Sequence, residues 1–200
     1  MQKYWRKRII GIFGALIQKC VPLSPINDEK NLTMGNISKE ILEEAWSQGA
    51  GHFIDFITDK YIEAIGGQLT ADNMDRLNAD QHTLLAYRYI KDEVMEGGFI
   101  QLIHNGYGPY VLDSPFPYVI KKIWGLTDFA KLIFNVRKEY HLHKEEIEAD
   151  MNEEDFMALY EQLEKLNDYG DDFLDDFQEE TTPAIALYVK ENIDKFCFGL

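Results

Sequence analysis

The residues with the clearest chemical potential are carboxylates, and they gather toward the C-terminal end of the chain. The segment from Lys144 to Glu180 holds sixteen Asp and Glu side chains and only two lysines. Its last part contains three adjacent acidic pairs, each four residues from the next: Asp171-Asp172, Asp175-Asp176 and Glu179-Glu180. Four residues of a helix rise about 6 Å, so two carboxylates per step give one negative charge per roughly 3 Å. A DNA strand carries one phosphate per about 3.4 Å, which is nearly the same linear charge density.

Like charges four residues apart cost a helix a few tenths of a kcal/mol per pair, so stability does not explain this arrangement. We expect the carboxylates to bind a basic site on another protein. The simpler alternative, an acidic solvated face that only aids solubility, stays open. Phe173, Leu174 and Phe177 lie between the pairs and are predicted to anchor the segment to the core. The predicted partner-binding residues are Glu153, Glu154, Asp155, Glu161, Glu164, Asp168, Asp171, Asp172, Asp175, Asp176, Glu179 and Glu180.

The overall charge supports a basic partner and argues against nucleic acid. The 200 residues have a formal net charge of −15. Residues 1–20 carry five basic side chains and no acid, so the rest of the chain is more acidic still. Binding to phosphates requires lysine and arginine to neutralise them, which this surface does not supply. A positively charged protein is its natural complement.

A metal-dependent enzyme is the hypothesis from a different class. His141 and His143, with the nearby Glu145 and Glu146, could bind zinc, although two near-adjacent histidines at a helix end more often contact terminal carbonyls or solvent. The spacing of acids around Gly170 does not fit a calcium-binding EF-hand loop. The sequence contains no nucleophile elbow, P-loop or dinucleotide-binding fingerprint. We therefore expect no enzyme activity, cofactor or metal.

The apolar periodicity predicts a single all-α domain of about eight helices over residues 37–200. Ser38 and Asn152 are predicted N-caps, and Asn78 with Gln81 a capping box. Gly66-Gly67 is predicted to end a helix. A helix is expected to run from Asn152 through Leu166, and Thr182-Pro183 to begin the last helix. The helix after Asn78 is predicted to bury Leu84, Tyr87, Ile90 and Val94 and to turn Arg88, Lys91, Asp92 and Glu96 toward water.

Residues 1–36 read as a basic amphipathic helix followed by a linker rich in proline and polar residues. We expect the helix to dock on the body of the protein; contact of residues 1–20 with a membrane surface is the alternative. The two cysteines, Cys20 and Cys197, have no metal-ligand spacing and favour a reducing, cytoplasmic location. Whether the two cysteines pair is left open.

The most distinctive local sequence lies in the middle of the chain. Gly97-Gly98-Phe99 is followed by Gln101 and by Asn105-Gly106, behind an amphipathic helix that contains Val94. The glycine pair is predicted to end that helix and to form a tight helical hairpin, with Phe99 packed beneath the corner. This pattern resembles the signature of the bacterial DNA-mimic protein family, whose C-terminal domain was long catalogued as a domain of unknown function. The resemblance covers about residues 77–197, and Glu96 departs from it where the family usually has asparagine.

The resemblance implies an acidic helical homodimer that occupies the DNA-binding surface of a transcription factor and so regulates transcription. An immunity-type inhibitor that neutralises a basic toxin through the same acidic face is the first alternative. Both functions are protein–protein interactions, and the sequence does not separate them.

Overall fold

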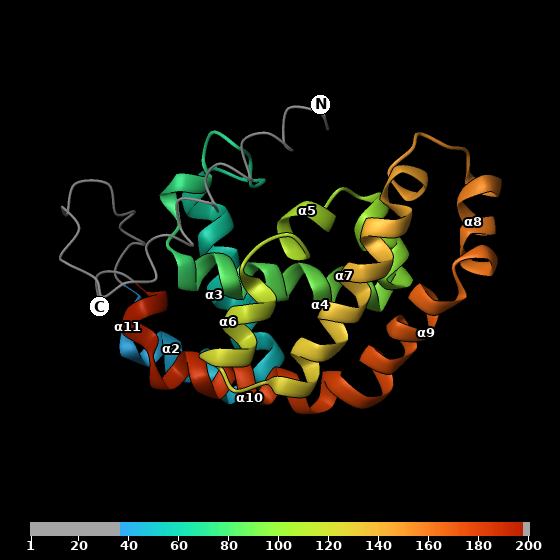
Figure 1. Cartoon of the computed structure of the whole chain (residues 1–200). Coiled ribbons are helices and arrows are strands. Elements are labelled where there is room, and N and C mark those ends of the chain that lie inside the picture. The colour runs from blue at the N-terminus through green and yellow to red at the C-terminus, as the bar shows by residue number, and fades with distance from the viewer. Residues whose placement is uncertain (1–36, 198–200) are drawn as a thin grey trace. The chain divides into compact units, whose positions relative to one another are not determined.

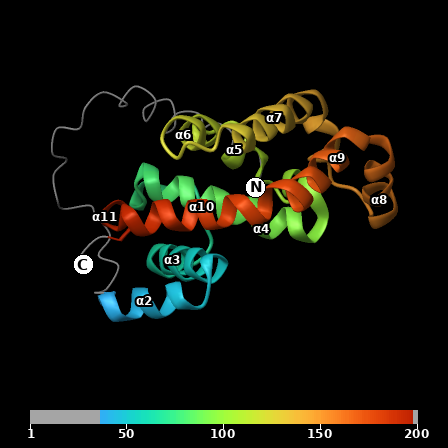
Figure 2. The ribbon, with the colours of Figure 1, turned by 90° about the horizontal axis from the view of Figure 1, so that it is seen from below.

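The computed structural model describes residues 37–197, which are almost entirely helical (Figures 1 and 2). These residues form no β-strand, so the prediction of an all-α fold is confirmed. The predicted amphipathic helix and linker of residues 1–36 lie outside the described part. Two compact units are present: unit 1 comprises residues 37–88 and 182–197, and unit 2 comprises residues 89–181. Within residues 37–197, no helix combines the length and apolar character needed to cross a bilayer.

Unit 1 begins with two helices whose ends follow the predicted signals. The Ser38 hydroxyl accepts a hydrogen bond from the Ile41 N–H at 3.4 Å and caps the first helix. Gly66 takes a left-handed conformation, with φ 88°, and stops the second. The elements of unit 1 are α2 (Lys39–Ser47), α3 (Ala50–Ile65), the short 3₁₀ helix η1 (Met74–Arg76), the start of α4 (Ala79–His104), the end of α10 (Gln178–Glu191) and α11 (Ile193–Phe196).

The predicted capping box at the start of α4 is confirmed in both directions. The Gln81 N–H donates to the Asn78 side-chain oxygen at 2.8 Å, and the Asn78 N–H donates to the Gln81 side-chain oxygen at 2.9 Å. The two amide nitrogens also donate to the carbonyls of Lys195 and Phe196, at 2.9 and 3.1 Å. The same two side chains therefore pair with backbone N–H groups at the start of α4 and hold α11 in place.

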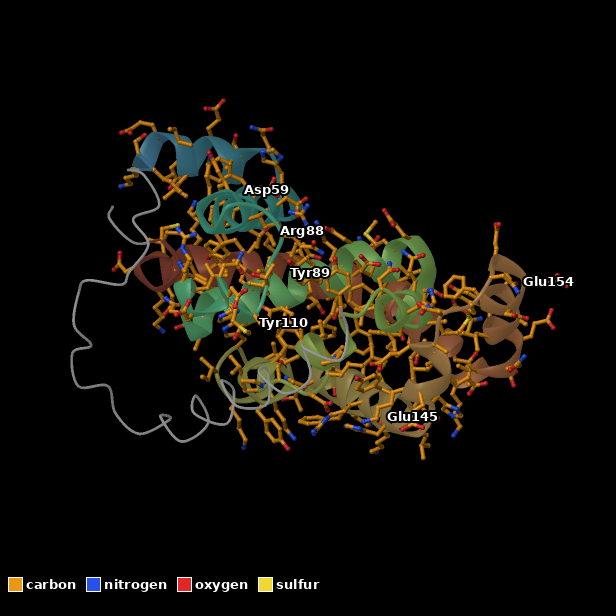
Figure 3. All side chains as sticks on the ribbon, turned by 90° about the horizontal axis from the view of Figure 1, so that it is seen from above. Asp59, Arg88, Tyr89, Tyr110, Glu145 and Glu154 are labelled. Carbon is orange, nitrogen blue, oxygen red and sulfur yellow. The ribbon has the colours of Figure 1, made fainter. Side chains whose placement is uncertain are left out.

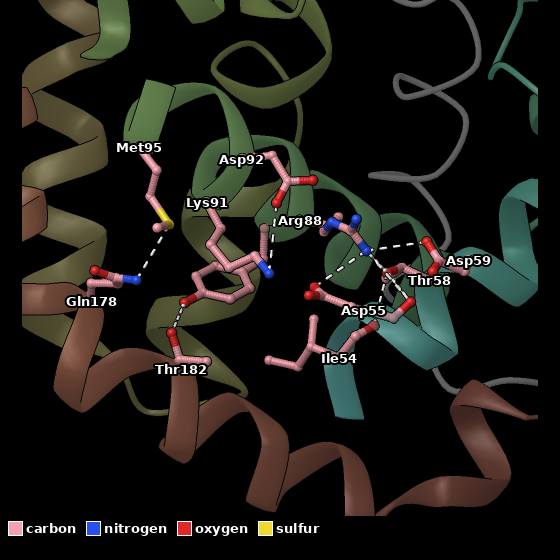
Figure 4. A network of polar contacts seen from close by, with 11 residues as sticks. Ile54, Asp55, Thr58, Asp59, Arg88, Lys91, Asp92, Met95, Gln178 and Thr182 are labelled. Atoms are coloured by element: carbon pink, nitrogen blue, oxygen red, sulfur yellow. Dashed lines mark hydrogen bonds and ion pairs between the residues drawn. The ribbon is translucent and has the colours of Figure 1, made fainter. Parts of the chain in front are cut away.

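A polar network joins α3 to the part of α4 in unit 1 (Figure 4). The Arg88 guanidinium pairs with Asp55 and with Asp59, each at 3.2 Å, and its side chain is only 19% exposed. Tyr87, which is fully buried as predicted, shares a 2.6 Å hydrogen bond with the Thr182 hydroxyl. Arg88 was expected to face water; it faces the carboxylates of α3 instead.

Unit 2 contains the predicted partner-binding residues. Its core is rich in aromatic rings, and Phe99, Phe116, Phe129 and Phe173 are almost completely buried. The Asn152 side chain caps α8 (Glu153–Gln162) as predicted, because it accepts from the Asp155 N–H at 2.9 Å. The elements of unit 2 are the rest of α4, α5 (Gly108–Val111), α6 (Phe116–Lys122), α7 (Thr127–Ile147), α8 (Glu153–Gln162), α9 (Glu164–Asp172), the π-helical turn η2 (Phe173–Phe177) and the first residues of α10.

The glycine pair ends a helical segment as predicted: Gly97 (φ −161°, ψ 28°) and Gly98 (φ 68°, ψ −171°) are non-helical and form a kink between the two helical parts of α4. Two other predicted helix boundaries are wrong. The helix that follows Asn152 breaks at Leu163, where φ is −111° and ψ is 50°. The last long helix does not begin at Thr182-Pro183: α10 starts at Gln178 and passes through Pro183. A proline inside a helix removes one backbone hydrogen bond, and the burial of Ile185 and Val189 on the same helix offsets that cost.

Lys91 is a further correction. It was predicted to face water, but only 8% of the residue is exposed. Its ammonium lies 3.6 Å from the Asp92 carboxylate, so the aliphatic stem is buried while the charge keeps an anionic neighbour.

Candidate functional site

The three acidic pairs lie on a continuous helical stretch formed by α9, η2 and α10, and we call them the acidic ladder: Asp171, Asp172, Asp175, Asp176, Glu179 and Glu180. All six side chains are exposed. None of the six forms an ion pair with a lysine or arginine among residues 37–197. Their negative charge is therefore not neutralised within the described part of the chain.

A π-helical turn keeps the pairs of the ladder in line. Four residues of an α-helix overshoot a full turn by about 40°, so pairs four residues apart would drift around the axis. In η2 the Gln178 N–H donates to the Phe173 carbonyl, five residues back, so this turn is wider than an α-helical turn. The wider turn reduces the drift. The ladder thus stays on one face of the stretch, and Phe173 points to the core from the other.

The ladder is anchored by aromatic rings. Phe173 is fully buried, and its ring centroid lies 6.4 Å from that of Phe99 and 5.8 Å from that of Phe129. Phe177 is half-buried, 6.2 Å from the same Phe129 ring. Leu174 was also predicted as an anchor, but it is 36% exposed. Two aromatic anchors therefore fix the helix and hold its carboxylates in place.

The glycine pair and the residues that follow it form a compact polar arrangement at the kink in α4. Gly98 has φ 68° and ψ −171°, a backbone conformation that is essentially restricted to glycine. Gln101 folds back over Gly97, where a β-carbon would lie 2.2 Å from its side-chain oxygen. Its amide donates to Glu93 and Glu96, both at 3.3 Å, and Glu96 is the residue that departs from the family pattern.

Asn105 completes this arrangement. Its amide donates to the Glu93 carboxylate at 2.7 Å, so two amides stabilise the acids on the N-terminal side of the kink. Gly106, with φ 87°, allows the turn into α5. The motif that the sequence singled out is thus a structural unit, and each of its polar residues stabilises the kink.

Comparison with known proteins decides the family. The model of the DMP19-like protein family matches residues 75–192, which is more than half of the chain. This chain belongs to the DMP19-like family. It is 30% identical over 142 residues to the DNA mimic protein DMP19 of Neisseria meningitidis serogroup B, an alignment that covers 70% of this chain and 84% of that relative. The resemblance to the DNA-mimic family is therefore confirmed.

The other predicted partner-binding residues of this DMP19-like protein fall into two sets. Glu164 and Asp168 precede the ladder on the same helical stretch. They are four residues apart, and Asp168 lies three or four residues before the first pair of the ladder, so both acids continue its face. Glu153, Glu154 and Asp155 occupy the first turn of α8, and Glu154 projects away from the ribbon (Figure 3). Glu161 lies at the other end of α8, and all six of these acids are exposed.

The first-turn acids of α8 and the acidic ladder differ in how far the fold explains them. Acids in the first turn of α8 complement the positive end of its helix dipole, so stability alone accounts for those three. The ladder lies in the middle of a continuous helical stretch, where no dipole favours negative charge. The ladder is therefore the stronger candidate for a function outside the fold.

The alternative of a metal site at His141 and His143 finds no support in the geometry. His141 Nε2 lies 2.8 Å from the Asp113 carboxylate, whereas His143 lies 3.4 Å from Glu146 through Nδ1. Within residues 37–197, no group of three or more histidine, cysteine or carboxylate side chains is placed to hold a metal ion. The two histidines contact different carboxylates, and His143 Nε2 also lies 3.9 Å from Glu139.

A shallow cleft of about 250 Å³ lies beside α9, and His143 is one of its lining residues. Glu139 also lines it, and the Lys165 ammonium is 3.1 Å from that carboxylate. His141 is not part of the cleft. The cleft therefore does not join the two histidines, as the enzyme hypothesis requires.

Tyr160 was not predicted to be a functional residue, and Gly170 was not predicted to have a structural role. The Tyr160 hydroxyl donates to the Gly97 carbonyl at 2.7 Å, and burial raises the pKa of this tyrosine. Gly170 lies against the backbone of Gly98. A glycine inside an acidic helix was the available signal, because glycine weakens a helix and is kept there when a close approach requires it.

Proposed function

We propose that this protein is a DNA mimic whose acidic ladder occupies the nucleic-acid-binding surface of a basic partner, such as a transcription factor. The observation that supports this function most strongly is the ladder itself: six exposed carboxylates, without ion pairs among residues 37–197, along one face of an anchored helical stretch. The name of the relative from Neisseria meningitidis, a DNA mimic protein, agrees with it.

The dimensions of the ladder suit this role. From its first to its last residue the ladder rises about 13 Å, the length of roughly four phosphate steps along one DNA strand. Phe173 and Phe177 hold it against the core, so little conformational entropy is lost when a partner binds. A disordered acidic tail of the same charge would lose more. Rigid display of charge is what favours mimicry over a face that only aids solubility.

Capture at two salt concentrations tests the electrostatic basis of this function. The immobilised full-length protein is expected to retain a basic protein from the native lysate. Retention should fall at least about tenfold between about 50 mM and about 200 mM salt, because several exposed charge pairs are screened together. Mass spectrometry of the retained fraction gives the partner. Retention that does not change with salt would contradict an electrostatic interface.

We also propose a cytoplasmic location, where DNA-binding proteins of a bacterium act. The homodimer that the family resemblance implies remains a prediction, and sedimentation velocity of the full chain would test it.

A further inference from the structure

The kink in α4 contacts both acidic helices of unit 2. On α8, the Tyr160 hydroxyl donates to the Gly97 carbonyl at 2.7 Å. One turn earlier, the Phe156 ring lies 4.6 Å from that of His104, at the end of α4. The acids of α8 are therefore carried on a helix that is fixed to α4 at two points, one at the kink and one at its C-terminal end.

The contact with α9 is of another kind, because it joins backbone to backbone. A β-carbon on Gly170 would lie 3.4 Å from the Gly98 Cα and 3.9 Å from the Phe99 nitrogen. Gly170 immediately precedes the first residue of the ladder, and Phe173, one turn later, packs against Phe99. The start of the ladder thus rests directly on the glycine pair.

We propose that the Gly97-Gly98-Phe99 kink is the seat that sets the position of the acidic ladder relative to α8. Gly98 supplies a backbone conformation that other residues rarely adopt, and Gly170 supplies the close approach. Gly97, Gly98, Phe99, Tyr160 and Gly170 are then positioning residues, which act on a partner through the helices that they hold. The consequence for binding rests on the proposed function of the ladder; the positioning itself does not.

Substitution of Gly170 separates positioning from stability. Gly170→Leu places atoms beyond a β-carbon that is already in contact with Gly98, so α9 must move away from the kink. Gly170→Ala is the matched control, since a contact of 3.4 Å is an ordinary van der Waals distance and alanine strengthens a helix. The two variants change the same residue, but only the leucine variant prevents the close contact between residue 170 and Gly98.

Distances between spin labels report the position of the ladder without any partner. Met157 on α8 and Leu174 in η2 are both exposed. The labels are attached to cysteines introduced by Met157→Cys and Leu174→Cys in a Cys20→Ser, Cys197→Ala background. We expect the distance distribution to shift in Gly170→Leu and to match that of the parent protein in Gly170→Ala. Identical distributions in the two variants would overturn the proposal.

Partner affinity gives the second readout. Gly170→Leu is expected to weaken capture of the basic partner about tenfold, because the ladder and the acids of α8 no longer meet it together, and to lower the salt dependence of binding. If Gly170→Leu only lowered the stability of the protein, the molecules that remain folded would bind the partner with unchanged salt dependence. A shifted distance between the labels with unchanged affinity for the partner would support the positioning role of the kink. It would count against the proposed function of the ladder instead.

Discussion

Reversal of Asp171, Asp172, Asp175 and Asp176 to lysine is expected to weaken capture of the basic partner at least about 100-fold, because attraction at four positions becomes like-charge repulsion. The fold should survive, since all four side chains are exposed and form no ion pair with the described lysines and arginines. Binding to the immobilised partner, measured beside the circular dichroism of each variant, checks both expectations.

A matched variant separates the place of the charge from its amount. Reversal of Glu44, Asp75, Glu191 and Asp194 to lysine changes the net charge equally, at four exposed positions of unit 1. This variant should bind nearly as well as the parent protein. Equal losses in the two variants would mean that the partner senses only net charge, and unchanged capture by both would exclude the ladder as its binding site.

Acidification from pH 7 to pH 5 is expected to lower the free energy of unfolding through His82. Burial lowers the pKa of His82 to about 4, although its hydrogen bond to the Met74 carbonyl at 2.7 Å partly opposes this shift. The unfolded chain has the ordinary pKa of about 6.5, so between the two values it binds more protons than the folded chain. Stability is therefore complete above pH 6.5 and is lost as the pH falls toward 4, by about 2 kcal/mol between pH 7 and pH 5.

Urea unfolding of the parent protein and of His82→Gln at both pH values measures this contribution. The variant should be less stable at pH 7, where a buried hydrogen bond is perturbed, but it should lose less stability on acidification. Burial raises the pKa of Asp80, two residues earlier in the chain, which acts in the opposite direction. That effect is present in both proteins and cancels in the comparison. Equal pH dependence in the two proteins would contradict the role of His82.

Local signals in the sequence predicted the helices well where the chemistry is itself local. The capping box of Asn78 and Gln81, the cap at Asn152 and the stop at Gly66 each depend on atoms a few residues apart. The exposure of the ladder followed from its charge, because unpaired carboxylates are rarely buried. Fold class and candidate site were therefore within reach of the sequence.

Features that depend on long-range packing were not. The π-helical turn at Phe173–Phe177 and the passage of α10 through Pro183 depend on buried contacts that outweigh local preferences. The contact between Gly170 and Gly98 joins residues 72 positions apart, and no local pattern encodes it. The glycine pair was recognised as a helix-ending signal, but its role as a seat for α9 emerges only from the fold.

Competition with DNA tests mimicry most directly. The partner retained by this protein is purified and bound to a fluorescently labelled duplex, and the protein is then added while the anisotropy of the duplex is followed. Mimicry predicts that the duplex is released as the protein binds, and that the variant with four ladder aspartates reversed releases none. A ternary complex in which the duplex stays bound, or a partner that binds no DNA, would contradict the account.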